Sequence, residues 1–166
     1  QGFNVVTPLQ LANALNTLVN GGTRFAPRLL YASKRAGDEQ AVKNHAPVTQ
    51  QVPVIERSNW DIVREGMRRV VHGVQGTARG IAPASGMQMA GKSGTAQVAA
   101  QERDEDMDEF TAQHLRHHAL FIAYAPFEKP AIVVAAVVEH GGGGSTEAAP
   151  VARAVIDAWL GQEPEP

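Results

Sequence analysis

The sequence predicts an α+β fold in which helices pack on an antiparallel sheet of three strands. The strand-like segments, residues 87–99, 118–125 and 131–139, follow one another, and the helical patterns lie before and after them. A short segment bounded by prolines, residues 126–130, joins the last two apolar runs, as is typical of an antiparallel hairpin. A parallel sheet would instead alternate its strands with helices.

The first helix is predicted to begin directly after Thr7. Pro8 follows this threonine, and Gln10 lies three residues beyond it. This order is a capping box with proline in the first helical turn, and the glycines at 21–22 provide the stop. Apolar residues recur at the spacing of one helical face and are expected in the core: Leu11, Ala14, Leu15, Leu18 and Val19.

A mixed section separates this helix from the next, with short extended pieces expected near residues 28–33 and 52–55 and a solvated loop between them. The second helix is predicted from Ser58, with Asp61 completing another capping box. Gly66 inside this helix lowers its propensity by about 1 kcal/mol relative to alanine and predicts close packing. The expected buried face consists of Trp60, Val63, Met67, Val70 and Val71.

The three predicted strands are expected to have different surroundings. A glycine-rich loop over residues 73–86 leads into the first strand, and the acidic stretch 101–109 is expected to be a solvated excursion. The run 131–139 is apolar almost throughout, which is typical of a central strand buried on both faces. We therefore expect this last strand to lie in the middle of the sheet.

A four-glycine segment, residues 141–144, follows the last strand and predicts a tight turn that exposes its backbone beside a cleft. The final helix is expected to start at Ser145 or Thr146 and to end at Gly161. Residues 1–161 then form one domain region, and residues 162–166 a disordered tail. The side chains expected to face inward are Val151, Val155, Ala158 and Trp159.

Composition excludes several classes of function. A net charge of −2 leaves no large basic face for nucleic acid, and the absence of cysteine excludes disulfides and thiol chemistry. The longest apolar run, residues 131–138, is too short to cross a bilayer, and no signal peptide pattern opens the chain. A hydrophobic content of 43% is sufficient for a core.

The segment GMQMAGKSGTAQ, residues 86–97, fits two motifs. Gly86, Gly91, Lys92 and Ser93 match the phosphate loop of nucleotide hydrolases, whereas Lys92-Ser93-Gly94 matches the K-[ST]-G signature of penicillin-recognising serine enzymes. A phosphate loop needs a strand before it and a helix after the lysine. Pro83 disfavours the strand and the residues after Ser93 favour a strand over a helix, so carboxylate recognition is the better interpretation.

Two other clusters resemble metal sites but lack the required partners. His114, His117 and His118 have metal-ligand spacing, yet no further cysteine or histidine lies at a finger-like distance, so a surface or packing role is favoured. Asp104, Asp106 and Asp108 resemble the start of a calcium loop without its glycine or its final glutamate. We expect neither a metal nor a cofactor.

Together the motifs resemble the C-terminal part of the transpeptidase domain of the penicillin-binding proteins, in particular the elongation-type penicillin-binding protein 2 family. The resemblance covers nearly the whole chain in order and spacing. It implies part of the fold shared by penicillin-binding transpeptidases and serine β-lactamases. The residues that carry it are 6–12 (VTPLQLA), 20–22 (NGG), 91–97 (GKSGTAQ), 115–118 (LRHH), 121–126 (FIAYAP), 132–139, 141–142 and 148–152 (AAPVA).

The resemblance implies an acyl-serine mechanism for cross-linking peptidoglycan stem peptides, which β-lactams block by imitating D-Ala-D-Ala. Lys92 would supply positive potential and take part in the proton network around the serine. The hydroxyls of Ser93 and Thr95 would bind the substrate carboxylate, beside Gly94. The backbone N–H of Thr95 would be half of the oxyanion hole.

The nucleophile motifs of that family, S-x-x-K and S-x-N, do not occur in these residues. The serines are Ser33, Ser58, Ser85, Ser93 and Ser145, and none has lysine three residues later or asparagine two later. We therefore expect the chain to be one wall of an active site, inactive alone, with a missing N-terminal half of the domain as its partner. A non-catalytic binding module of the same fold stays the alternative, and a nucleotide-binding domain a more distant one.

The resemblance also implies a location and partners. It places the domain on the periplasmic face of the bacterial inner membrane, with peptidoglycan stem peptides and β-lactams as ligands and a membrane glycosyltransferase of the elongation machinery as companion. Without the missing half, an edge strand and apolar surface would be exposed. We therefore expect the isolated chain to self-associate.

Overall fold

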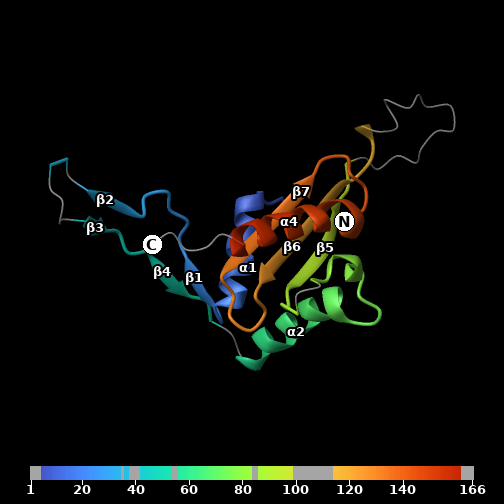
Figure 1. The fold of residues 1–166 in the computed structure, drawn as a ribbon, viewed down its shortest axis with the longest axis horizontal. Coiled ribbons are helices and arrows are strands. Elements are labelled where there is room, and N and C mark those ends of the chain that lie inside the picture. Colours follow the sequence, from blue (N-terminus) through green and yellow to red (C-terminus); the bar gives the residue numbers. More distant parts are fainter. Residues whose placement is uncertain are drawn as a thin grey trace.

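The computed structural model describes residues 5–34, 36–37, 42–53, 56–83, 86–98 and 114–161. A body of helices packed on a sheet carries a narrow arm that extends away from it (Figure 1). The predicted α+β class is confirmed. The elements of the body are α1 (Pro8–Val19), α2 (Ser58–His72), η1 (Arg79–Ile81), β5 (Ala90–Ala96), β6 (His118–Ala125), β7 (Ile132–Val138), η2 (Gly144–Ala148) and α4 (Ala149–Leu160).

The three-stranded antiparallel sheet has the order β5-β6-β7. Its register pairs Lys92 with Ile122 and Ala123 with Val134, so the hairpin predicted from the apolar runs is confirmed. The prediction that the last strand is central is wrong, because β6 lies between the other two strands. Apolar composition alone could not identify the central strand, since β6 and β7 each contain seven apolar residues, and β7, although apolar throughout, leaves Val137 39% exposed.

The capping box at the start of α1 is confirmed. The N–H of Gln10 donates to the Thr7 hydroxyl at 3.2 Å, and the Thr7 N–H donates to the Gln10 side-chain oxygen at 2.8 Å. These bonds satisfy two backbone donors that a helix N-terminus leaves without partners. The helix therefore begins where local chemistry dictates, and it ends before the glycines, as predicted.

The capping role predicted for Ser58 is wrong. Ser58 is already helical, Arg57 occupies the cap with no side-chain bond, and the Ser58 hydroxyl donates to the Glu56 carboxylate at 3.4 Å. The aspartate at 61 is too short a side chain to act as the glutamate of a capping box. The expectation of close packing at Gly66 is also wrong, because a Cβ added there would meet nothing within 4 Å.

An ion-pair cluster on α2 stabilises the helix surface. The Glu65 carboxylate accepts from the Arg68 Nε at 2.7 Å and from the Arg69 Nε at 2.9 Å, at the i,i+3 and i,i+4 spacings that face each other on a helix. The hydrogen bonds from Arg68 and then Arg69 lower the pKa of Glu65 from its ordinary 4.5 to about 2. Both arginines lie in the C-terminal half of α2, where positive charge also suits the helix dipole.

The arm consists of two short antiparallel ribbons, β1 (Thr23–Phe25) paired with β4 (Thr49–Gln51) and β2 (Ala32–Lys34) paired with β3 (Val42–Asn44). The extended pieces expected near 28–33 and 52–55 overlap these strands only at Ala32 and Ser33, and the interval expected to be a loop contains β3. The error has a physical cause: three-residue strands with mostly exposed side chains leave no alternating hydrophobic pattern to detect.

The final helix faces another way than predicted. The π-helical segment η2 begins at Gly144 and runs directly into α4 at Ala149, so helical backbone starts one residue before the predicted Ser145. Its buried residues are Ala149, Ala152 and Ile156, which pack in the main core with Phe121 and Met89. Small alanines let the helix lie close to the sheet. The residues expected inside are exposed, with Val151 at 48%, Val155 at 45% and Trp159 at 55%.

Some predictions lie outside the described residues. These are the acidic stretch 101–109 with the calcium-like aspartates, residue 99 at the end of the expected strand 87–99, residues 54–55 of the expected extended piece 52–55, and the tail 162–166. Within the described part, β5 begins three residues later than the strand expected from the sequence. No helix in that part is long and apolar enough to cross a membrane.

Candidate functional site

Strand β5 presents the K-S-G-T residues at an edge of the sheet. Among the described strands, β5 pairs only with β6, so its second edge has no strand beside it. Alternate side chains of a strand point to opposite faces. Lys92 lies opposite Ile122, whereas Ser93 lies opposite Phe121 and Thr95 opposite Ala119. The lysine and the two hydroxyls therefore lie on different faces of one open strand.

The Lys92 face borders an apolar groove between α1 and α2. The groove has a volume of about 530 Å³, and Lys92 is the charged residue in its lining. Lys92 itself is exposed, and its ammonium donates to the Ser93 carbonyl. Lys92 therefore places a solvent-accessible positive charge at the border of an apolar groove. The other lining residues are Leu11, Ala14, Leu15, Leu18, Val63, Gly66, Met67, Val70 and Ile122.

The two apolar helical stripes are less buried than expected because they line this groove. Leu15, Met67 and Val71 are buried, but Ala14 and Val63 are exposed and their neighbours are only partly covered. Both stripes were expected to be core. Instead, residues of both line an open groove beside the K-S-G-T strand, and Gly66 lies in that groove with open space where a side chain would be.

The opposite face of β5 is packed more tightly at its start than at its end. A Cβ on Gly91 would lie 2.5 Å from Phe121 Cε1, and Phe121 is completely buried. Ser93 and Thr95, further along, are half-buried and accessible. Glycine at 91 thus lets β5 lie against the core, while the hydroxyls two and four residues later stay available to a ligand.

The glycine turn packs against the middle of β5. A Cβ on Gly144 would lie 2.5 Å from the Gly94 carbonyl oxygen and 3.0 Å from the Gly94 nitrogen. Only a residue without a side chain permits this approach of one backbone to another. The turn predicted to lie beside a cleft therefore contacts the K-S-G-T residues directly.

The structure excludes the phosphate-loop interpretation. Lys92 and Ser93 lie inside strand β5, and the strand continues to Ala96. A phosphate loop requires a helix N-terminus directed at the anion from that position, and β5 supplies none. The described histidines, aspartates and glutamates also form no cluster of three suited to a metal ion. Carboxylate recognition stays as the interpretation of the motif.

The comparison with known protein families decides the relationship. The penicillin binding protein transpeptidase domain matches residues 1–157. The chain belongs to this family. The peptidoglycan D,D-transpeptidase MrdA of Haemophilus influenzae is 38% identical over 165 residues, which cover 98% of this chain and 25% of that relative. The chain therefore spans about a quarter of the relative's length.

Solved structures agree with the family assignment. Pseudomonas aeruginosa PBP2 in complex with WCK 5153 is 38% identical with a TM-score of 0.73, covering 98% of this chain and 31% of that one. The imipenem acyl-enzyme of penicillin-binding protein A from Mycobacterium tuberculosis is 30% identical, with a TM-score of 0.72 and coverages of 96% and 32%. A complex of PBP2 and MreC from Helicobacter pylori is 27% identical, with a TM-score of 0.67 and coverages of 97% and 26%.

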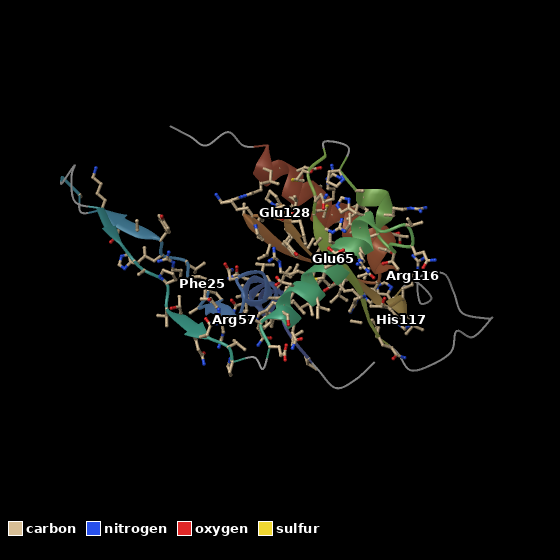
Figure 2. All side chains as sticks on the ribbon, turned by 90° about the horizontal axis from the view of Figure 1, so that it is seen from below. Phe25, Arg57, Glu65, Arg116, His117 and Glu128 are labelled. Carbon is tan, nitrogen blue, oxygen red and sulfur yellow. The ribbon has the colours of Figure 1, made fainter. Side chains whose placement is uncertain are left out.

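The K-S-G-T residues lie on a strand as predicted, but two features near that strand were not predicted as parts of a site. The predicted residues Lys92, Ser93, Gly94 and Thr95 lie together on β5, as the motif required. The groove beside Lys92 was not predicted, although an unusual glycine inside an apolar helical stripe was its sequence signal. Histidines also gather at one end of the sheet, where Figure 2 labels Arg116 and His117. The sequence predicted only a surface or packing role for them.

Proposed function

We propose that this chain forms the substrate-binding wall of a serine-type peptidoglycan D,D-transpeptidase. The observation that carries the proposal is the open edge of β5, which presents K-S-G-T in a chain that matches the transpeptidase family over residues 1–157. An unpaired strand edge can bind an extended peptide through its backbone groups. A stem peptide is a ligand of that kind.

Ser93 and Thr95 recognise the substrate carboxylate in this proposal. Their side chains share one face of β5, are both partly exposed, and can each donate a hydrogen bond to an anion. Hydrogen bonds to a charged acceptor are worth about 1.5–3 kcal/mol each. Lys92, bordering the apolar groove, adds positive potential near the reacting centre.

The chemical step is an acyl transfer. A serine oxygen from outside these residues attacks the penultimate D-alanine carbonyl, and the proton passes to a neighbouring base. The Thr95 N–H donates to the oxyanion as the tetrahedral intermediate forms. The C–N bond then breaks, and terminal D-alanine leaves with the proton. The amine of a second strand attacks the acyl-serine, the serine C–O bond breaks, and the proton lost by the amine returns to the serine oxygen through the base.

The same proposal implies where the domain lies and which partners it has. Peptidoglycan stem peptides lie outside the cytoplasm, so the site faces the periplasm. A membrane glycosyltransferase that makes the glycan strands is the expected companion. The remaining part of the domain, which supplies the nucleophile, covers the groove between α1 and α2 and pairs with open strand edges.

A labelled penicillin tests the proposal. The complete domain, containing these residues and the preceding part of the protein, should be acylated, whereas the 166-residue chain alone should not. Thr95→Ala and Ser93→Ala should each lower the acylation rate by about 10- to 100-fold, from the loss of one charge-assisted hydrogen bond. Thr49→Ala and Ser33→Ala, on the arm, are matched controls and should retain the wild-type rate.

The outcomes separate catalysis from a binding-only role, which the absence of S-x-x-K in these residues keeps open. A complete domain that binds stem peptide without acylation would identify a binding module of the same fold. Acylation of the isolated chain would overturn the assignment of the nucleophile to another segment. Equal rates in the Thr95 and Thr49 variants would exclude the carboxylate-binding role of β5.

A further inference from the structure

Two histidines connect the ends of β6 and β7 at the edge of the site. The backbone N–H of His140 donates to the Nδ1 of His118 at 3.0 Å, and the two rings meet edge to face with centroids 4.8 Å apart. The Nδ1 of His140 lies 3.2 Å from the carbonyl oxygen of Arg116. We refer to His118 and His140 as the histidine clasp.

His140 holds a backbone conformation that its residue type disfavours. Its φ is 54°, in the left-handed region, where a side chain crowds the following carbonyl. Such a conformation persists only when neighbouring contacts enforce it. The hydrogen bond from its N–H to His118, the ring contact and the Arg116 carbonyl are those contacts.

The clasp lies directly next to the glycine turn. His140 directly precedes this turn, and the N–H of Gly142 donates to the His117 carbonyl at 2.8 Å. A Cβ on Gly141 would lie 2.9 Å from Val138 Cγ1, so the start of the turn also fits tightly. Through Gly144, the other end of the turn lies against the backbone of Gly94.

We propose that the histidine clasp positions the K-S-G-T residues for the reaction by holding the glycine turn against Gly94, and that it holds only while His118 is neutral. His118 is thus a positioning residue, because it acts on the substrate-binding strand through the turn. The effect on acylation rests on the proposed function, whereas the clasp itself does not.

The direction of the pH dependence follows from the hydrogen bond. Nδ1 of His118 can accept the His140 N–H only when it carries no proton, so protonation removes the acceptor and places two N–H groups against each other. The turn should therefore loosen in acid once His118 gains a proton at Nδ1. Among the described residues, the ionisable groups that contact the clasp or adjoin it in the chain are His114, Arg116, His117 and Glu139, and the register partner of His118 on β5, Ala96, is uncharged.

Amide hydrogen exchange in the 166-residue chain tests the clasp. In the wild type, protection factors at residues 94–95 and 141–144 should fall about tenfold between pH 7.5 and 5.5, the size expected for one hydrogen bond. His118→Asn keeps an acceptor near the Nδ1 position but does not titrate, so its protection should stay high and flat. His118→Ala should be weakly protected at every pH. His45→Ala, on the arm, is the matched control and should behave as the wild type.

A flat wild-type profile, or His118→Ala indistinguishable from the wild type, would overturn the clasp. If His118→Ala does not fold, the contrast between the wild type and His118→Asn decides.

Acylation of the complete domain tests the positioning role separately. His118→Ala should slow acylation by about tenfold and His118→Asn should restore it, removing the acid-side loss of the wild type. If the wild type is acylated and His118→Ala is acylated at the same rate, the positioning role is rejected but the clasp is not. A wild type that is not acylated would reject the proposed function, and exchange would still judge the clasp.

Discussion

Replacing Gly91 by alanine tests how β5 is held against the core. The new Cβ would lie 2.5 Å from Phe121 Cε1, 2.6 Å from Cζ and 2.9 Å from the Ile122 carbonyl oxygen. Carbon atoms in good contact lie about 3.5 Å or more apart, so the ring would have to retreat by about 1 Å. Phe121 is 0% exposed, which leaves it no open space to enter.

The cost of this substitution follows from the crowding. Overpacking a dense core costs about 1–3 kcal/mol, and backbone on the second side places Gly91→Ala near the upper end. Each kcal/mol lowers the melting temperature by about 2–4 °C in a chain of this size, so we expect a fall of about 6–12 °C. Calorimetry or thermal melting by circular dichroism measures it.

Two other glycine substitutions are matched controls for Gly91→Ala. A Cβ on Gly94, in the same strand, would lie 3.4 Å from Leu120 Cβ, so Gly94→Ala should leave the melting temperature within about 2 °C of the wild type. Gly66→Ala, in α2 with open space around it, should stabilise by about 0.5–1 kcal/mol. Equal melting temperatures for the alanine variants at 91 and 94 would refute the packing argument.

Further predictions concern the helix caps, an ion-pair cluster and the exposed apolar surface. Thr7→Ala should lower the free energy of unfolding by about 1 kcal/mol because it removes a capping box. Ser58→Ala should change it by less than about 0.5 kcal/mol. Denaturant titration measures both, and equal losses would show that Ser58 does cap α2. NMR titration of the Glu65 carboxyl should give a pKa of about 2. Because this pKa is lowered on folding, its stabilising effect is complete above about pH 4.5 and is lost as the pH falls toward 2; a midpoint near 4.5 would exclude the pairing with arginine. Sedimentation of the isolated chain should show self-association, reduced by Val155→Glu or Trp159→Glu on α4; a cooperatively unfolding monomer would contradict this.

Much of the fold was predictable where the decisive interactions are local. The capping box of α1 lies within four consecutive residues, so it can be recognised in the sequence from Thr7 and Gln10. The K-S-G-T motif likewise occupies one strand, and alternation places Lys92 on one face and the hydroxyls of Ser93 and Thr95 on the other. These relations depend on the geometry of one segment and not on what packs against it.

Other features could not be predicted because they depend on distant segments. The central strand is chosen by pairing, which composition does not encode when β6 and β7 are similarly apolar. Shape complementarity decides which face of α4 is buried. Ala152 and Ile156 fit against the sheet and are buried, whereas the larger apolar side chain of Trp159 is exposed. The contact between Gly144 and Gly94 joins residues fifty positions apart, and no local pattern marks it.

The sequence by itself determined the family, the α+β class, the first helix and the placement of the K-S-G-T residues on a strand, because motifs and local hydrogen bonds need only neighbouring residues. Only the tertiary structure decided which helical faces are buried, that an open groove borders Lys92, and that the glycine turn after His140 touches Gly94. The physical reason is that burial and backbone contact are properties of surfaces that meet after folding, and each surface is assembled from segments that are far apart in the chain.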